Sequence, residues 1–242
     1  MTFAKNDFIE IEFTGRIKDG EVFDSNIAEE LKKLNSSQPA KPFVFCLGQD
    51  MFLNGIEEFL IEKDVGSYEI ALQPDKAFGP RNTSLVQMVP LKIFIEHKVN
   101  PVPGAVLTFD NKLGKVLTVS GGRVMVDFNN PLAGKEVVYN IKVTRKIEDI
   151  KEKVSALNEF LFRRDFKFEI KDKKLIIETD KQFKSFIELF KDKFKEMIGL
   201  DLEVKEIEPS KPKTEVKEEK EEVKAEKKEG KKEIENIFDN SE

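Results

Sequence analysis

The feature that most constrains the fold is a series of short apolar runs separated by glycine, proline and turn residues. In the first run, Phe8 to Phe13, apolar and charged residues alternate at period two after the first residue. This alternation is typical of a β-strand with one buried face. Further strands are predicted at 22–24, 43–47, 67–72 and 137–143, with a turn at 18–21 and short helices at 27–34 and 55–61.

The middle of the chain has a different texture. Between Leu85 and Asp127, prolines and glycines separate β-like runs at 106–109, 114–119 and 123–127. Ser120-Gly121-Gly122 between the last two runs is a strong hairpin signal. We predict a small β-rich subdomain here.

The third part predicts a separate domain of the pattern α-β-β-α-β. Its first helix, 148–162, has an apolar face, and two strands follow at 166–170 and 175–178. A single second helix is predicted from Gln182 to Ile198, followed by a strand at 200–207. The apolar face of that second helix consists of Phe183, Phe186, Ile187, Phe190, Phe194 and Met197. A domain of this size gains stability from pairing with a partner.

The last part of the chain is dominated by charge. Lys and Glu alternate from Pro209 to Gly230 with almost no apolar residues, so the segment cannot bury enough surface to offset its ordering entropy. A disordered tail is expected over 209–242. Ile234, Ile237 and Phe238 restore one apolar turn, either as a docking motif or as a frayed end.

The composition excludes several classes of function. The net charge is -5, with no basic surplus to neutralise phosphates, so nucleic acid is not expected as a partner. The single cysteine, Cys46, lies in an apolar run and is expected to be buried in a protein of a reducing compartment. His97 is the only histidine and is expected on the surface, so no metal site is predicted. No signal peptide and no run of about 18 apolar residues is present, and a soluble cytoplasmic protein is expected.

Four segments carry the pattern that bears on function. They are Phe13-Thr14-Gly15, Asp19-Gly20-Glu21-Val22-Phe23-Asp24-Ser25, Pro42 to Gly48, and Ala77-Phe78-Gly79. They supply aromatic groups, one isolated carboxylate and turn glycines, but no general base, activated nucleophile or metal cluster. Aromatic surface comes almost wholly from the 21 Phe residues, which have no polar tip and suit an apolar pocket. Such a pocket suits the binding and twisting of a peptide bond.

These segments, together with 52–57, 74–79 and 139–143, resemble the motifs of the FKBP-type peptidyl-prolyl isomerases. The resemblance implies that Phe23, Phe43, Ile56 and Tyr139 line a proline pocket, with Phe13 and Phe52 in the same site and Phe78 covering it. It also implies that Asp24 lies beside the reacting amide without ionic chemistry and that the backbone N–H of Leu53 receives a substrate carbonyl. No cofactor is implied.

Three positions depart from the family pattern. Phe13 and Phe78 stand where the family has tyrosines, whose hydroxyls orient the aspartate and donate to the substrate carbonyl. Ile56 stands in the place of a tryptophan, as aliphatic residues do in SlyD-like members. We expect catalysis to survive because the apolar shape remains.

The second half of the resemblance points to the SlyD-like branch. Residues Leu85 to Pro90 resemble the entry into its inserted flap, and Asp127 to Val137 resemble the return, with Asn130 in the place of a histidine. In that branch the flap binds unfolded chains in an apolar groove. The candidates for such a groove are Leu85, Val89, Ile93, Phe94, Val106 and Phe109, although each is equally well explained as part of the flap's own core.

The resemblance implies an α+β protein: an FKBP-type antiparallel half-barrel sheet wrapped on a short helix, an inserted flap and an extra C-terminal domain. The expected domains are 1–83 plus 130–147 for the isomerase, 84–129 for the flap, 148–208 for the C-terminal domain and 209–242 for the tail. The C-terminal domain resembles that of long archaeal members more loosely. The implied activity is prolyl isomerisation with chaperone activity on unfolded polypeptides that contain X-Pro bonds.

Two other functions stay open on the sequence. A holdase of the same fold would have weak or no catalysis, because Phe13 and Phe78 lack hydroxyls. An assembly protein would use residues 148–208 for a homodimer or another partner. Without the family, Phe23, Phe43 and Phe45 are predicted to be core and Asp24 a turn cap, and the pair Glu57-Glu58 is predicted to be solvated charge.

Overall fold

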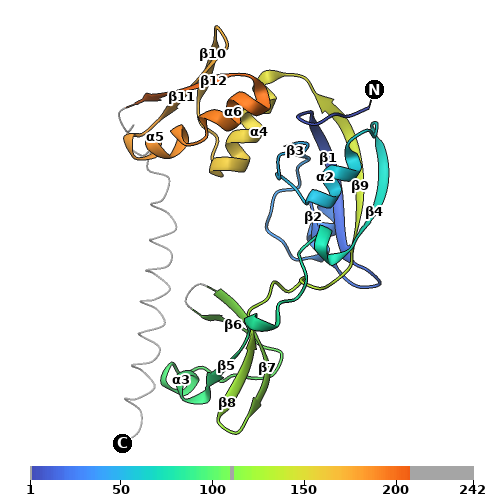
Figure 1. The fold of residues 1–242 in the computed structure, drawn as a ribbon, viewed down its shortest axis with the longest axis vertical. Helices are drawn as coiled ribbons and strands as arrows, with labels where there is room; N and C mark the ends of the chain where they lie inside the picture. The colour runs from blue at the N-terminus through green and yellow to red at the C-terminus, as the bar shows by residue number, and fades with distance from the viewer. Residues whose placement is uncertain (1, 110–111, 208–242) are drawn as a thin grey trace, which may run out of the picture.

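The structure is a computed structural model that describes residues 2–109 and 112–207. The fold is α+β, with a five-stranded, a four-stranded and a three-stranded sheet. Figure 1 shows the five-stranded part between the other two, with the four-stranded sheet at one end and the three-stranded sheet at the other. The predicted tail at 209–242 lies outside the described residues.

The five-stranded sheet is antiparallel and is built on two long strands. These are β1 (Phe8–Ile17) and β9 (Val137–Ile147), which pair along the whole of β1. Strand β4 (Gly66–Leu72) lies on the far side of β9. Strands β2 (Val22–Ser25) and β3 (Phe43–Cys46) share the other edge of β1. Strand β9 follows the middle subdomain in the chain. The five-stranded sheet is therefore built from segments that lie before and after that subdomain.

The shared edge of β1 has a gap between β2 and β3, and a side chain fills it. The Asn26 side chain accepts a hydrogen bond from the Phe13 N–H at 2.7 Å and donates one to the Ile11 carbonyl at 2.9 Å. Backbone groups in a partly buried strand need such partners. Asn26 therefore continues the ladder and fixes the end of β2, next to Asp24.

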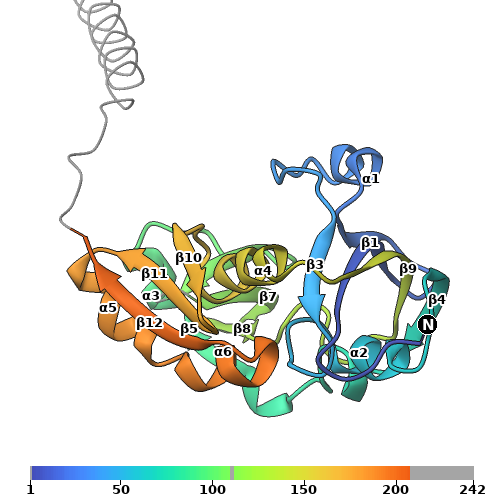
Figure 2. The ribbon, with the colours of Figure 1, turned by 90° about the horizontal axis from the view of Figure 1, so that it is seen from above.

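Helix α2 (Asn54–Leu60) covers the sheet and buries Ile56 and Leu60 in its core. The shorter α1 (Ala28–Lys33) projects away from the sheet, as Figure 2 shows. Two 3₁₀ turns, η1 (Pro74–Lys76) and η2 (Thr83–Leu85), lead toward the insert. The largest fully buried side chains of this part are Phe8, Ile9, Ile11, Phe45, Leu47, Ile56, Leu60, Tyr139, Ile141 and Ile147.

The middle subdomain is a four-stranded antiparallel sheet in the order β5-β8-β7-β6. Its strands are β5 (Val86–Pro90), β6 (Val106–Phe109), β7 (Lys112–Ser120) and β8 (Arg123–Asp127). Gly121 and Gly122 form the β7–β8 hairpin turn with φ of +55° and +74°, as the predicted two-residue turn requires. We call residues 84–129 the insert.

A helix in the insert was not predicted. Helix α3 (Leu91–Glu96) follows Pro90 directly, and only Phe94 on it is buried. One and a half turns with a single buried residue give no helical periodicity, so the sequence pattern indicated only strands. The buried core of the insert is small and consists of Phe94, Val116, Val124 and Val126.

The two chain segments that enter and leave the insert are bonded to each other. The Arg81 guanidinium donates to the Asp127 carboxylate at 2.6 Å and 3.1 Å. Asn82 and Asn129 exchange two hydrogen bonds, from the Asn82 N–H at 2.8 Å and from the Asn129 side-chain amide at 2.9 Å. These contacts hold the two segments together at the boundary with the five-stranded part.

The C-terminal part contains α4 (Ile150–Phe162), β10 (Phe168–Lys171), β11 (Lys174–Thr179) and β12 (Asp201–Glu206). β10 pairs antiparallel with β11, and β12 pairs parallel with β11. The single helix predicted from 182 to 198 is wrong: the structure has α5 (Lys181–Glu188) and α6 (Lys191–Ile198). The helical segment breaks at Leu189 and Phe190, and both helices contact β12.

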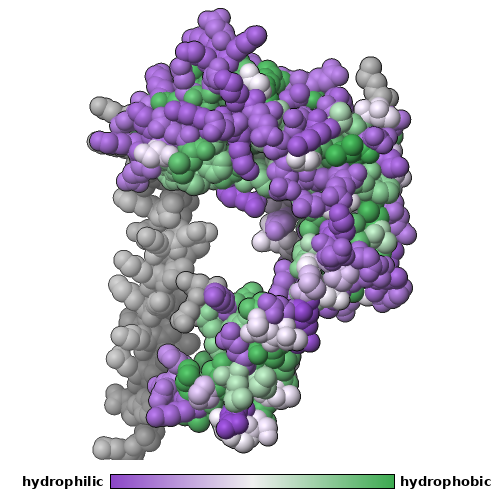
Figure 3. All heavy atoms as spheres, in the orientation of Figure 1, coloured by the Kyte–Doolittle hydropathy of each residue, from purple (hydrophilic) through white to green (hydrophobic). Residues whose placement is uncertain are grey.

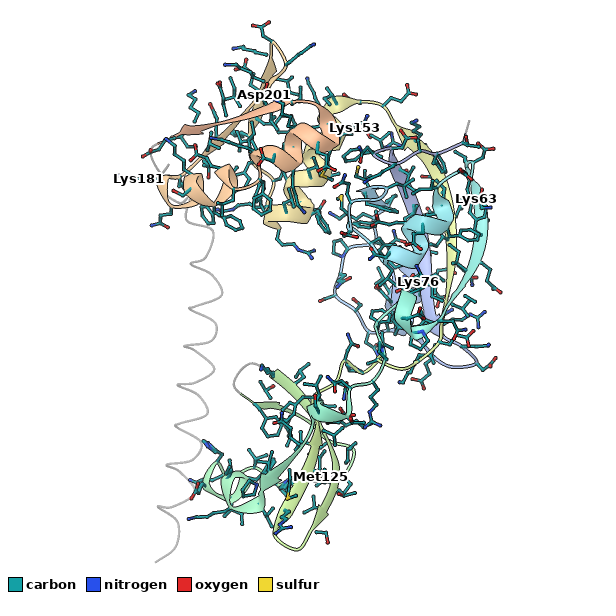
Figure 4. All side chains as sticks on the ribbon, in the orientation of Figure 1. Lys63, Lys76, Met125, Lys153, Lys181 and Asp201 are labelled. Carbon is teal, nitrogen blue, oxygen red and sulfur yellow. The ribbon has the colours of Figure 1, made fainter. Side chains whose placement is uncertain are left out.

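The C-terminal part packs on the first sheet through α4 and α6. Helix α4 contacts β3, and the Lys153 ammonium lies 5.6 Å from the centre of the Phe8 ring. Figure 4 labels Lys153 on α4, between the C-terminal part and the five-stranded part. The Gln49 side-chain amide donates to Glu196 of α6 at 3.0 Å. The buried residues of the two parts form one continuous apolar cluster. Within residues 2–109 and 112–207, no helix is long and apolar enough to cross a membrane.

Candidate functional site

A chain of aromatic rings lies across the five-stranded sheet. Tyr139 on β9 is 1% exposed, and its ring centre is 5.8 Å from that of Phe23 and 5.7 Å from that of Phe52. The chain continues from Phe23 to Phe78 at 5.6 Å and from Phe52 to Phe43 at 5.6 Å. Most of these pairs are edge-on or tilted, the geometry that aromatic rings prefer.

Phe13 joins the same chain from β1. Its ring centre lies 5.1 Å from that of Phe52 and 6.1 Å from that of Tyr139. The structure thus brings together the six predicted aromatic residues: Phe13, Phe23, Phe43, Phe52, Phe78 and Tyr139. They come from separate segments of the chain, so the sheet and not sequence proximity assembles them.

Gly15 explains how the rings approach the sheet so closely. It lies on β1 between Asp24 on β2 and Tyr139 on β9. A Cβ atom at position 15 would lie 2.8 Å from the Tyr139 ring and 3.1 Å from the Phe23 ring. The glycine of the Phe-Thr-Gly segment is therefore required by contact with the rings.

Asp24 is held at the end of β2, half-buried and close to the rings. Burial raises the pKa of its carboxyl above the ordinary value of 3.8, although a backbone hydrogen bond involving Ser25 partly opposes that rise. The same carboxylate contributes to raising the pKa of Tyr139, after the larger contribution from burial. Asp24 thus places one polar group against an otherwise apolar wall.

A buried carboxylate shapes the loop that carries Phe52 and Leu53. Glu57 is 2% exposed, and it accepts backbone hydrogen bonds from Gly48 at 2.7 Å, Gln49 at 3.0 Å and Phe52 at 2.6 Å. The prediction that Glu57 is a solvated charge is wrong; Glu58 beside it is exposed and pairs with Lys76. The sequence does hold a signal for the burial of Glu57. This residue lies about one helical turn after the Gly48–Phe52 loop, whose backbone N–H groups need an acceptor.

Leu53 lies at the N-terminal boundary of α2, where its carbonyl accepts from the N–H groups of Ile56 and Glu57. Within the part of the chain that the structure describes, the N–H of Leu53 has no hydrogen-bond partner. Leu53 as a residue is half-buried, and we predict that this N–H donates to a bound molecule. The predicted hydrogen bond to a substrate carbonyl therefore has a donor that is unpaired among the described residues.

Ile56 differs from the other predicted site residues. It is fully buried in the core beneath the loop and has no exposed surface. Because it is fully buried and does not line the groove described next, Ile56 is part of the core and not an open wall.

A groove of about 810 Å³ begins at these rings. Phe13, Asp24, Phe43 and Phe52 line one side of it, whereas Phe23, Ile56, Phe78 and Tyr139 do not. Its volume is in the range of ligand sites, roughly 300–1,000 Å³. The predicted residues therefore divide into those that line the groove and those that lie outside its lining.

The candidates for an apolar groove on the insert also divide. Leu85, Ile93 and Val106 are exposed, whereas Phe94 is 3% exposed and belongs to the insert's core. Val89 and Phe109 pack against that core, so with Phe94 they are structural. Sequence reasoning missed several exposed apolar residues of the insert: Met88, Ile95, Val99, Val102 and Leu113.

The remaining reactive groups do not form a second chemical site. Cys46 is buried, and burial raises the pKa of its thiol to about 12, so it is not a thiolate near neutral pH. Among the residues that the structure describes, no three acidic, His or Cys side chains are grouped to hold a metal ion.

Comparison with known proteins gives the family of this arrangement. The chain is 30% identical over 143 residues to the short-type peptidyl-prolyl cis-trans isomerase of Methanocaldococcus jannaschii, which covers 57% of this chain and 90% of that protein. It is 32% identical over 142 residues to the FKBP-type isomerase SlyD of Helicobacter pylori, covering 56% and 70%. The Escherichia coli FKBP-type 16 kDa isomerase is 29% identical over 144 residues, covering 57% and 89%.

Two further comparisons concern parts of the chain. The family model of the IF domain of FKBP26 matches residues 87–132, which contain α3 and nearly all of the four-stranded sheet. Among solved structures, the three FKBP domains of wheat FKBP73 match 62% of this chain and 42% of theirs, at 13% identity and a TM-score of 0.33.

The fold is an antiparallel sheet that carries a chain of aromatic rings, and the homologues are peptidyl-prolyl cis-trans isomerases. The chain belongs to the FKBP-type peptidyl-prolyl cis-trans isomerase family and is an enzyme of that class. The resemblance noted on the sequence motifs is confirmed, as is the α+β fold class.

Proposed function

We propose that this protein isomerises X-Pro bonds of unfolded polypeptides in the aromatic site, without acid–base or covalent chemistry, and that its insert holds the client chain. The observation that carries the first half is the chain of rings from Phe78 to Phe43 beside the half-buried Asp24. Its clients are then partly folded chains with exposed prolines, in a reducing, cytoplasmic compartment.

The chemistry that such a site performs is conformational. The barrier to rotation of a peptide bond is about 18–20 kcal/mol and comes from amide resonance. An apolar wall removes water from the amide carbonyl and favours the twisted, less conjugated form over the planar one. The free N–H of Leu53 supplies a donor that fixes the substrate backbone while the proline ring rests on the aromatic side chains.

Exchange NMR on a short Phe-Pro peptide tests this half of the proposal. The wild type is compared with Asp24→Ala and with Asp165→Ala, an exposed aspartate outside the site. We expect the wild type and Asp165→Ala to accelerate exchange equally and Asp24→Ala to be several-fold slower. No acceleration by the wild type would leave a holdase, consistent with Phe13 and Phe78 lacking hydroxyls.

The exposed apolar side chains of the insert support the second half. Met88, Ile95 and Leu113 are exposed to solvent on this small domain. Such exposed apolar surface can bind apolar segments of unfolded chains. Figure 3 shows apolar surface on the insert, at the lower end of the view. Holding a client there raises the local concentration of its prolines at the isomerase site.

Replacement of residues 84–129 by a short linker tests the division between capture and catalysis. We expect proline-limited refolding of a protein substrate to fall far more than isomerisation of a tetrapeptide. Equal losses would contradict the division. The contacts of Arg81 and Asn82 are lost in this variant, so its thermal unfolding must be recorded beside the activities.

A second candidate function, homodimer formation through residues 148–208, is favoured by one observation. Phe183, Phe186 and Leu189 are exposed on and just after α5. Exposed aromatic groups of this kind are typical of protein interfaces. Sedimentation of the full chain and of a Phe186→Ser, Leu189→Ser variant tests it: a dimer that becomes a monomer supports the proposal, and two monomers contradict it.

A further inference from the structure

The groove that begins at the aromatic site has a second wall, from another part of the chain. Facing Phe13, Asp24, Phe43 and Phe52 across the groove is helix α4 of the C-terminal part. The side chains that α4 contributes are Lys151, Glu152, Ser155, Ala156, Glu159 and Phe160, followed by Arg163 just after the helix. Gln38, Pro39, Lys41 and Pro42, which lead into β3, form the rim between the two walls.

The residues of α4 that line the groove recur at intervals of three and four, so one continuous face of the helix lies along it. The middle of that face is formed by two small residues, Ser155 and Ala156, which leave the groove open. The acidic residues at its edges are already neutralised. Glu159 pairs with Lys41 across the rim, and Glu152 pairs with Arg145 at 2.8 Å.

We propose that the client segment next to the proline lies in this groove, against α4, so that the C-terminal part belongs to the substrate site of the isomerase. The proposal rests on the proposed function, because it extends the same site. The occupant is identified because the groove is continuous with the predicted proline site. Four residues of that site, namely Phe13, Asp24, Phe43 and Phe52, also line the groove. A polypeptide bound at the rings has its flanking residues at the mouth of the groove.

The length of the groove along α4 distinguishes it from the proline pocket. A tetrapeptide spans at most about 14 Å when fully extended. The lining face of α4, from Lys151 to Arg163, is about 18 Å long. A substrate must therefore be longer than a tetrapeptide to use both the rings and the whole of α4.

The sequence offers a sharp probe, because the chain has no tryptophan. Ser155 is exposed on α4, so Ser155→Trp narrows the groove and adds a single indole fluorophore to it. The matched control is Lys193→Trp, an exposed position on α6 that does not line the groove. Thermal unfolding of both variants checks that they fold as the wild type does.

Two substrates share an Ala-Phe-Pro-Phe centre: the tetrapeptide, and a peptide of about 15 residues with neutral polar flanks that is long enough to follow α4. Exchange NMR gives the ratio of the long-peptide to the short-peptide rate constant for each protein. We expect Ser155→Trp to lower this ratio about fivefold, the loss expected for contacts of one or two flanking residues. Lys193→Trp should keep the wild-type ratio. Adding the long peptide should also shift the indole emission of Ser155→Trp and not that of Lys193→Trp.

An unchanged ratio together with unchanged emission of Ser155→Trp would overturn the inference. A shift in emission caused by removing residues 208–242, with no peptide present, would also overturn it, because the occupant would then be the chain's own terminus. If the wild type accelerates neither peptide while the long one still shifts the emission of Ser155→Trp, the catalytic proposal fails and the groove proposal stands.

Discussion

Apolar side chains are placed in opposite ways in the isomerase part and in the insert. In the former, Tyr139 is almost completely buried and its ring contacts three other rings. In the latter, Leu113 is 62% exposed, and the fully buried core comprises four residues. Of the fourteen exposed large apolar side chains among the described residues, eight lie in the insert, so exposure there is concentrated and not scattered.

The difference agrees with what each task of the proposed function requires of a surface. Twisting one amide requires walls at fixed positions, and close packing provides them because buried rings have few alternative arrangements. Holding many different unfolded chains requires apolar surface that is already in contact with water, since any sequence can then be covered. The two surfaces compete for the same residue types, and an inserted subdomain separates them.

The largest effect is expected where the isomerase part depends on a single buried group. Glu57→Ala leaves three backbone N–H groups of the Gly48–Phe52 loop without their acceptor. We expect a loss of about 3 kcal/mol or more in the free energy of unfolding, measured by urea denaturation, and a large fall in peptide isomerisation.

Glu58→Ala is the matched control for that variant. Glu58 is the next residue, is exposed and forms a surface ion pair with Lys76, an interaction worth about 0–1 kcal/mol. Equal losses in the two variants would show that the buried carboxylate does not hold the loop. That result would contradict the idea that buried contacts fix the pocket while the insert relies on exposed apolar side chains.

The next effect tests whether the pocket really depends on close packing. In Gly15→Ala the new methyl group would lie 2.8 Å from the Tyr139 ring, so the ring must move. Overpacking of this kind costs about 1–3 kcal/mol, and we expect peptide isomerisation to fall along with it.

Gly66→Ala is the control, because a Cβ atom there meets the Tyr68 side chain at 3.4 Å or more, an ordinary contact. It should retain activity. A fully active Gly15→Ala would mean that the rings tolerate displacement and that the pocket is not a rigid wall.

A smaller, selective effect is expected on the insert. Met88→Ser with Leu113→Ser removes two exposed apolar side chains and touches none of its buried core. We expect suppression of client aggregation to fall several-fold, while isomerisation of a tetrapeptide stays at the wild-type rate. Val65→Ser, which removes an exposed valine of the isomerase part, should change neither readout. Unchanged aggregation suppression in the double variant would move client capture away from the insert.

The sequence predicted most of the elements because strands with one buried face leave a period-two pattern, as in Phe8 to Phe13. The six aromatic residues that the family motifs pointed to do lie together in the structure, and their role in binding a substrate stays a prediction. The sequence did not predict Glu57, whose burial depends on three N–H groups from a loop that precedes its helix. Nor did it predict α3, which is too short to show a period.

The wall that α4 adds to the groove lay beyond sequence reasoning for a different reason. Ser155 and Ala156 are small and carry no motif, and their helix was correctly expected to be amphipathic. What places them opposite Phe43 is the packing of α4 on β3. Contacts between parts of the chain more than a hundred residues apart leave no local pattern, so only the structure brings these residues to one site.

The smallest expected effect concerns the polar group of the pocket. Burial raises the pKa of Asp24 above 3.8, so the folded protein binds that proton more tightly than the unfolded chain. Ionised Asp24 therefore opposes folding at neutral pH, and Asp24→Asn should be more stable there. Because the carboxyl is partly solvated, the gain should be below about 1 kcal/mol. It should shrink as the pH falls through the raised pKa and vanish below about 3.8, where the wild-type carboxyl is protonated in both states.

Asp201 provides a control of the opposite sign. The hydrogen bond from Lys195 lowers the pKa of its carboxyl, so its ionised form favours folding. Asp201→Asn should lower the melting temperature at neutral pH, and that loss should shrink as the pH falls. Melting temperatures of the three proteins between pH 3 and 7 separate the two signs. A loss of stability in Asp24→Asn at neutral pH would mean that the carboxylate has a partner that stabilises it, and that the pocket wall beside the proline is less apolar than its rings indicate.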